Sequence, residues 1–162
     1  MKVAYFAGGC FWCIASVYNQ LDGVINVTSG FSGGKEINPT YEDVKAQKTS
    51  HRETIKISYD EKKINFEELL KLFINNVDLY DDGGQFIDRG RSYTLAIYYQ
   101  DNNEKETAIR LLKEQEKLTS KKPCVAIEKF INFYSASEHH QNFNLNHPEE
   151  FEKELKESGR KK

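Results

Sequence analysis

Hydrophobic residues fall into short runs that predict strands and helices in alternation. Compact apolar runs predict strands at 3–7, 24–31, 53–59, 95–99 and 125–133. Apolar residues at three- and four-residue spacing predict helices at 11–20, 65–76 and 103–118, followed by short helices near 140–145 and 148–157. The first six elements follow the order β-α-β-β-α-β. This order predicts an α+β fold, a ferredoxin-like split β-α-β sandwich with additional loops and C-terminal helices.

The least patterned part of the chain is 35–50, which we expect to be an irregular excursion. The clearest helix is 65–76, because Asn65 can cap it and Glu68 occupies the capping-box position. The chain contains no repeat, proline-rich linker or low-complexity block. Residues 1–157 are therefore expected to form a single domain, and 158–162 a frayed tail.

Composition narrows the classes of partner. The 162 residues are 38% hydrophobic and 30% charged, an ordinary globular balance, and the net charge is −2. This charge gives no electrostatic case for binding nucleic acid or an anionic membrane. Uncharged stretches are too short to span a bilayer, and the apolar run after Met1 is too short for a secretory signal. We expect a cytoplasmic protein without a membrane segment.

Three cysteines, Cys10, Cys13 and Cys124, are too few and odd in number for a disulfide scaffold. Cys10 follows Gly8-Gly9, where a strand ends and a helix begins. Unpaired backbone N–H groups at a helix start carry partial positive charge and favour a thiolate. We therefore expect Cys10 to be a nucleophile whose thiolate is favoured at neutral pH.

The residues around Cys10 allow several interpretations. Phe11 and Trp12 can wall an apolar pocket for a methyl or thioether group, although single aromatics more often pack into a core. A thioredoxin-type Cys-x-x-Cys motif normally follows an earlier β-α unit, which is absent here. A zinc site needs further ligands, and the spacing of the available histidines fits no standard zinc pattern; these are His139, His140 and His147. A nucleophile with a resolving partner needs only that Cys13 lie one helical turn away.

Five segments of the chain follow the order found in one known family. They are Gly9-Cys10-Phe11-Trp12-Cys13, Gly30-Phe31-Ser32-Gly33-Gly34 with Asn38-Pro39-Thr40-Tyr41, His51-Arg52-Glu53-Thr54 with Tyr59-Asp60, Asp88-Arg89-Gly90-Arg91-Ser92-Tyr93, and Phe133-Tyr134 with Ala136 and His140-Gln141. They resemble the motifs of the A-type peptide methionine sulfoxide reductases. Any one motif is moderate support, whereas five in family order, over nearly the whole chain, are strong support.

The resemblance implies the sandwich fold and a reaction in which Cys10 attacks the sulfoxide sulfur and becomes a sulfenic acid as methionine leaves. It implies that Glu53 protonates the sulfoxide oxygen and that Tyr93 hydrogen-bonds it. Asp88 would hold the polar network, and Phe11 and Trp12 would cradle the methyl group. The chemistry agrees, because a departing oxide must gain protons and a desolvated glutamate can retain one. Taken alone, Glu53 would be read as a solvated charge at a strand edge.

Some positions depart from the family pattern. Phe31, which the resemblance places at the substrate site, stands where tyrosine is usual, so one hydroxyl contact to the oxygen is lost or replaced by water. Ser92 stands where glutamine is usual. Ser137 and His139 stand where glutamate and tyrosine are usual. These departures concern the hydrogen bonds of the site and not the reaction class.

Recycling must return the sulfenic acid on Cys10 to a thiol. The Gly-rich C-terminal segment with recycling cysteines that many members carry has no counterpart in this sequence. We expect Cys13 to be the resolving residue, with Cys124 and an external thiol as alternatives. The resemblance implies thioredoxin or another dithiol as reductant, no bound cofactor or metal, and methionine-S-sulfoxide as substrate, free or in oxidised proteins.

Two other functions stay open from the residues alone. A general dithiol-disulfide oxidoreductase would use Cys10 and Cys13 and would reduce insulin without acting on sulfoxides. A non-catalytic zinc-binding module would combine these cysteines with histidines and would hold stoichiometric zinc. Neither alternative accounts for Glu53, Tyr93 or the glycine segments.

Overall fold

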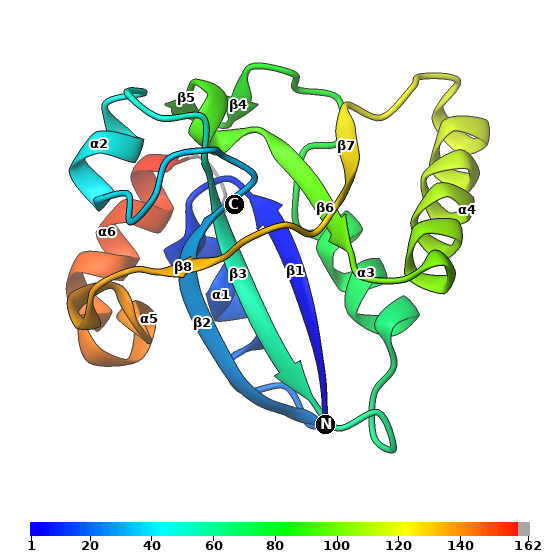
Figure 1. Ribbon diagram of the computed structural model, residues 1–162, viewed down its shortest axis with the longest axis horizontal. Coiled ribbons are helices and arrows are strands. Elements are labelled where there is room, and N and C mark those ends of the chain that lie inside the picture. The colour runs from blue at the N-terminus through cyan, green and yellow to red at the C-terminus, as the bar shows by residue number, and fades with distance from the viewer. Residues whose placement is uncertain (159–162) are drawn as a thin grey trace.

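A six-stranded sheet organises the computed structural model, which describes residues 1–158 (Figure 1). Its central strands lie in the order β6-β1-β3-β2 and are all antiparallel; they are β1 (Lys2–Gly8), β2 (Val24–Ser32), β3 (Arg52–Tyr59) and β6 (Leu95–Tyr99). The helix α1 (Phe11–Tyr18) connects β1 to β2, and α3 (Phe66–Asn75) lies between β3 and β6. Each helix thus joins two strands that a third strand separates, which confirms the predicted split β-α-β sandwich.

Further elements extend this core at both edges. After α4 (Asn102–Thr119), β7 (Val125–Lys129) pairs in parallel with β6, and β8 (Tyr134–Ser135) pairs with β2. A small hairpin of β4 (Gly84–Gln85) and β5 (Asp88–Arg89) precedes the 3-10 turn η1 (Arg91–Tyr93). The chain then forms the 3-10 turn η2 (Glu138–His140), α5 (Phe143–Asn146) and α6 (Pro148–Ser158).

Three sequence-based expectations differ from the structure. The strand expected over 125–133 ends at Lys129, because the chain leaves the edge and packs Phe130 and Phe133 on the sheet face that carries Tyr5. The region 35–50 contains a short helix, α2 (Tyr41–Lys45), whose start is capped by the Thr40 side chain. The first helix ends at Tyr18 and not at residue 20.

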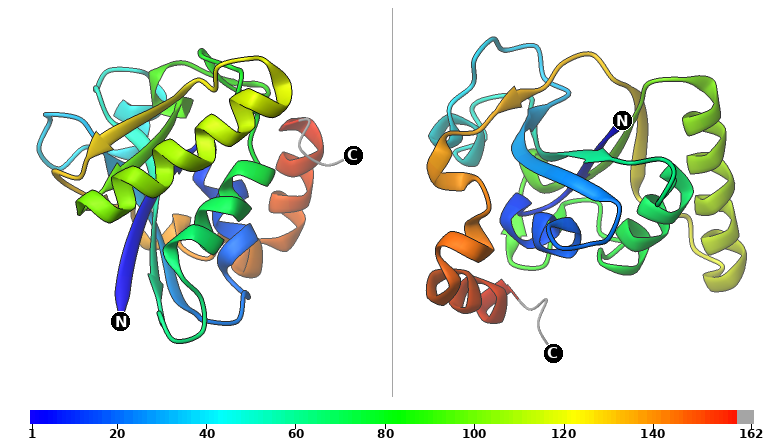
Figure 2. Two further views of the ribbon diagram at one scale, coloured as in Figure 1. Left: turned by 90° about the vertical axis from the view of Figure 1, so that its right-hand side faces the viewer. Right: turned by 90° about the horizontal axis from the view of Figure 1, so that it is seen from below.

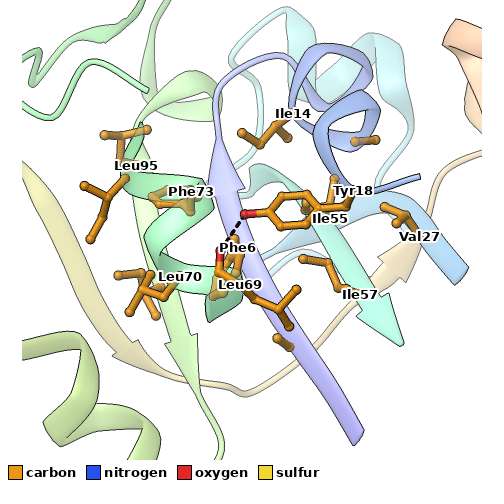
Figure 3. Close-up of a cluster of buried hydrophobic side chains, with 14 of the residues drawn as sticks. Phe6, Ile14, Tyr18, Val27, Ile55, Ile57, Leu69, Leu70, Phe73 and Leu95 are labelled. Carbon is orange, nitrogen blue, oxygen red and sulfur yellow. Dashed lines mark hydrogen bonds between the residues drawn. The ribbon is translucent and has the colours of Figure 1, made fainter. Parts of the chain in front are cut away.

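The main core lies between the sheet and the helices α1, α3 and α4 (Figure 3). Side chains alternate along β1, so Phe6 enters this core while Tyr5 and Ala7 face the opposite side. The Tyr18 hydroxyl donates a hydrogen bond of 2.8 Å to the Leu69 carbonyl and so ties α1 to α3. These contacts fix the end of β1 relative to the start of α1.

The loops that follow β1 and precede β6 meet at one end of the sheet, near α2 and the β4–β5 hairpin (Figure 1). Figure 2 shows α5 and α6 beside α1, on the side of the molecule away from α4. No helix within residues 1–158 is long and apolar enough to cross a bilayer. The tail expected from residue 158 lies almost wholly outside the described residues, and the single-domain boundary at 157 stays a prediction.

Candidate active site

The end of β1 turns sharply into α1 and places Cys10 at the helix start. Gly9 has a φ of +88°, which favours glycine, and a Cβ on Gly8 would lie 3.1 Å from side-chain atoms of Ile14 and Phe73. Cys10 is the residue before the first helical turn, and its carbonyl accepts the N–H groups of Cys13 and Ile14. Only 9% of Cys10 is exposed. The two glycines therefore allow a buried thiol to face the end of the sheet.

Glu53 approaches this thiol from β3. Its Oε1 accepts the backbone N–H of Phe11 at 3.1 Å, and its buried Oε2 has no hydrogen-bond partner among the described residues. Burial raises the pKa of Glu53 well above its ordinary value, and negative charge on Cys10 raises it further, against the Phe11 hydrogen bond. A thiolate at Cys10 thus keeps the proton on Glu53. A thiolate at Cys10 and a protonated carboxyl at Glu53 can therefore exist together in this site.

The expectation that the helix start favours the Cys10 thiolate is wrong for the substrate-free site. A hydrogen bond with the Cys13 side chain raises the pKa of Cys10 most, and burial and the charge on Asp88 act in the same direction. A backbone hydrogen bond from Cys13 opposes these effects without overcoming them. The Cys13 hydrogen bond and burial therefore raise the pKa of Cys10 and favour its thiol form, against the partial charge of the helix start.

Tyr93 and Asp88 complete the polar side of the site. Tyr93 is nearly buried, and its pKa is raised by burial and by negative charge on Glu53. It therefore stays a neutral hydrogen-bond donor. The charge of Asp88 helps to raise the pKa of Cys10, Glu53 and Tyr93, which places Asp88 in the same neighbourhood. The structure thus brings together the four polar or reactive residues Cys10, Glu53, Asp88 and Tyr93.

The aromatic side of the site has an inner and an outer part. Phe11 and Phe31 are fully buried, with ring centroids 5.8 Å apart, and they belong to the main core. Trp12 is only partly buried and stacks on Phe143 of α5, with ring centroids 3.9 Å apart. Its Nε1 donates to Nδ1 of His140 at 3.2 Å. Trp12 is therefore the aromatic ring that a ligand outside the core can reach.

Comparison with known proteins decides the family. The family model of peptide methionine sulfoxide reductase matches residues 2–162. The chain belongs to the peptide methionine sulfoxide reductase family. A Bacillus velezensis relative, peptide methionine sulfoxide reductase MsrA, is 40% identical over 161 residues, which cover 98% of this chain and 91% of the relative.

Solved structures agree with this assignment. Reduced Mxr1 from Saccharomyces cerevisiae is similar with a TM-score of 0.86 at 25% identity, over 91% of this chain and 86% of that one. The structure of the same yeast protein in complex with Trx2 has a TM-score of 0.58 at 19% identity, over 88% of this chain and 84% of that one. Both share the α+β fold described above.

Three residues of this sulfoxide reductase site were not predicted as site residues. Tyr41 of α2 stacks near Trp12, with centroids 6.1 Å apart, and lies 4.2 Å from the His140 ring. The Gln47 side chain exchanges two hydrogen bonds with Ser92, the residue before Tyr93. His140, which matched a motif without a clear role, braces Trp12. Tyr41 had a signal in its Asn-Pro-Thr-Tyr segment, whereas Gln47 had none.

The cysteines of this family member occupy different environments. Cys13 is 4% exposed and lies in a cluster with Cys10, Phe143 and Phe151, beneath α5 and α6. Cys124 precedes β7, which β6 separates from β1. Cys13 is therefore the cysteine in contact with Cys10. Among the described residues, no group of three or more histidine, cysteine or acidic side chains is placed to hold a metal ion.

Proposed function

We propose that this protein reduces methionine-S-sulfoxide, free or in proteins, to methionine, with Cys10 as nucleophile and Glu53 as general acid. One observation carries the proposal: a buried carboxyl with a raised pKa and a free Oε2 faces a buried thiol. The Phe11 N–H holds Oε1 in place, so Oε2 is the oxygen available to a ligand. Family membership supports the same reaction.

The first step transfers oxygen from substrate to enzyme. The Cys10 sulfur attacks the sulfoxide sulfur while Glu53 protonates the sulfoxide oxygen. The S–O bond of the substrate breaks as an S–S bond to Cys10 forms. The hydroxyl oxygen then bonds to the Cys10 sulfur while the S–S bond breaks, so methionine leaves and Cys10 is a sulfenic acid. The sulfoxide gains two electrons and the thiol loses them, so the step needs no other reductant. Tyr93 donates a hydrogen bond to the oxygen, and Asp88 orients the polar groups. Trp12 contacts the apolar part of the substrate, and the buried rings of Phe11 and Phe31 pack behind it.

The second step restores the thiol. Cys13 attacks the sulfenic sulfur of Cys10, a disulfide forms, and the oxygen leaves as water. The hydrogen bond between the two side chains supports this pairing, whereas β6 lies between Cys124 and the nucleophile. Thioredoxin or another dithiol then reduces the disulfide. The complex of the yeast relative with Trx2 supports a reductant of this class.

A reducing compartment fits this cycle. The three cysteines are free thiols, and free thiols persist where thioredoxin-type reductants are present. We therefore propose the cytoplasm as the compartment.

The test combines epimer assays with mass spectrometry. Purified protein should reduce the S epimer of methionine sulfoxide with dithiothreitol, and Cys10→Ser should abolish turnover. After one equivalent of substrate, peptide mapping should find a Cys10–Cys13 disulfide. Cys13→Ser should instead accumulate a Cys10 sulfenic acid, while the matched Cys124→Ser variant should still form the disulfide.

Specific outcomes would overturn the assignments. Activity on neither epimer, or on the R epimer alone, would contradict the reaction. Insulin reduction without sulfoxide reduction would favour the general dithiol oxidoreductase. A Cys10–Cys124 disulfide in the unmodified protein would reject Cys13 as resolving residue and leave the first step intact.

A further inference from the structure

Arg52 and Glu53 are consecutive residues of β3, so their side chains point to opposite faces of the sheet. Glu53 faces the site and accepts the Phe11 N–H. The Arg52 guanidinium contacts Tyr98, which belongs to the cluster on the other face with Tyr5. Within residues 1–157, Arg52 is the one buried lysine or arginine, at 4% exposure. A buried cation is costly unless it is well paired, so its partners indicate what it does.

Three side chains hold the Arg52 guanidinium. Its Nε donates to Oγ1 of Thr94 at 2.9 Å, and its Nη1 donates to the Tyr98 hydroxyl at 3.0 Å and to Oε1 of Glu128 at 3.2 Å. Thr94 immediately precedes β6, Tyr98 lies on β6, and Glu128 lies on β7. A planar guanidinium has donors in fixed directions and can join partners on separate elements. Arg52 therefore cross-links β3 to the start of β6 and to β7.

This cross-link lies where the backbone ladders of the central strands end. The strand β1 lies between β3 and β6 and turns into α1 at this end of the sheet (Figure 1). Its ladder with β3 ends at Phe6 and Ile55, and its ladder with β6 ends at Gly8 and Leu95. The general acid and the hydrogen-bond donor of the site both lie beyond these last pairs. Side-chain contacts must therefore help to set their separation.

Thr94 connects Arg52 to the turn that carries Tyr93. The Thr94 hydroxyl donates to the Arg91 carbonyl at 2.7 Å, and the Thr94 N–H donates to the same oxygen at 3.1 Å. Thr94 directly follows Tyr93, and Arg52 directly precedes Glu53. The bond between Arg52 and Thr94 thus joins the chain neighbours of the two groups that act on the sulfoxide oxygen.

We propose that Arg52 is a positioning residue, which fixes Tyr93 relative to Glu53 by its hydrogen bond to Thr94 across the end of β1. The proposal rests on the function proposed above, because it concerns how both groups reach one oxygen. The guanidinium lies on the other face of the sheet and does not touch the substrate. It acts through the backbone that its hydrogen bonds hold in place.

The test compares Arg52→Met and Thr94→Val, which remove the two ends of the same hydrogen bond. Pre-steady-state formation of methionine at saturating substrate should slow by about 10-fold in each, since a misplacement of about 1 Å can cost roughly 100-fold. Reduction of the oxidised enzyme by dithiothreitol uses neither Tyr93 nor Glu53 and should stay within about twofold. The double variant should be no slower than the slower single variant, because both substitutions break one connection.

Two further variants separate geometry from charge and from general stability. Arg52→Lys keeps the charge beside Glu128 but lacks the fixed fork of donors, so methionine formation should stay slow. Glu128→Gln keeps an oxygen that accepts from Arg52 and removes the charge, so methionine formation should match that of wild type. Urea unfolding of each variant shows whether the rates follow stability.

The outcomes distinguish this proposal from the reaction itself. An inactive wild-type protein would refute the proposed function. With an active wild type, unchanged rates in the single variants, multiplied losses in the double variant or rescue by Arg52→Lys would refute the role of Arg52 alone. Equal slowing of both half-reactions, or slowing in Glu128→Gln, would show a general structural role and would also overturn it. If Arg52→Met does not fold, Thr94→Val decides the question, because it leaves Arg52 in place.

Discussion

The backbone N–H of Phe11 and the carboxyl of Glu53 form a hydrogen bond of 3.1 Å that leaves the other carboxyl oxygen buried and unpaired. The first residue of α1 thereby orients the acid that serves the cysteine before it. The same bond slightly favours the charged form of Glu53, but burial outweighs it. The reactive pair is thus built by a strand and a helix start that meet at the end of the sheet.

Glu53→Gln is expected to abolish efficient turnover and to change the pH dependence of stability. The folded pKa of Glu53 is raised, so the folded protein holds its proton where the unfolded chain has released it. Wild-type stability should therefore fall as pH rises from about 4.3, the ordinary value, through the folded pKa. Glutamine escapes this loss, so the variant should gain stability relative to wild type as pH rises above the ordinary glutamate range. Urea unfolding at several pH values measures the difference, and a difference that does not change with pH would contradict the assignment.

His140→Phe is expected to weaken substrate binding through Trp12. Phenylalanine keeps a ring against Tyr41 but removes the Nδ1 that accepts the Trp12 N–H. Loss of one such bond, about 1 kcal/mol, should raise KM roughly fivefold. Steady-state kinetics of both proteins, with circular dichroism as a check on folding, decide this point.

The same bond predicts an acid transition in wild-type fluorescence. Burial, and then charge on His139, lower the pKa of His140, so Nδ1 should lose its acceptor role only below the ordinary histidine range. Trp12 emission should shift there in wild type and stay constant in His140→Phe. His139→Asn should move the midpoint to higher pH, and an unchanged transition in His140→Phe would exclude His140 as its source.

Gln47→Ala is expected to lower kcat by displacing Tyr93. The Gln47 side chain accepts the Ser92 N–H at 3.0 Å and donates to the Ser92 hydroxyl at 2.7 Å, so it holds the turn that carries Tyr93. Losing both bonds should cost about 1–3 kcal/mol of stability and about tenfold in kcat. Ser92→Ala retains the backbone bond and should show a smaller loss of both. Equal losses in the two variants would mean that Gln47 does not position the turn.

Much of this architecture follows from local sequence. Period-two and helical patterns place the four central strands and α1, α3 and α4, because their apolar faces must all be buried in one core. The strand expected to reach 133 ends early for a tertiary reason. Phe130 and Phe133 are apolar enough for a strand, but their rings pack against Tyr5 on the other face of the sheet. No local sequence pattern distinguishes a continued strand from a segment that packs on the other face of the sheet.

The site, like the fold, has some features that the sequence predicts and others that depend on tertiary structure. Cys10 was predictable from its place between a strand and a helix, whereas Glu53 and Tyr93 were predictable only because their motifs resemble those of the family. The raised pKa of Cys10 was not, because burial and the Cys13 contact depend on helices α5 and α6 far along the chain. Gln47 lies 45 residues from Ser92, so their pairing exists only in the folded protein.

The short distance along the chain between Cys10 and Cys13 has a thermodynamic consequence. A disulfide between them closes a loop of four residues, which in the chain-entropy model constrains the unfolded state by only about 2 kcal/mol. A bridge from Cys10 to Cys124 would close more than 100 residues and add about 4.7 kcal/mol. The free energy of unfolding therefore changes little between the oxidised and reduced forms of the Cys10–Cys13 pair. Reduction of the disulfide consequently costs the domain little folding stability.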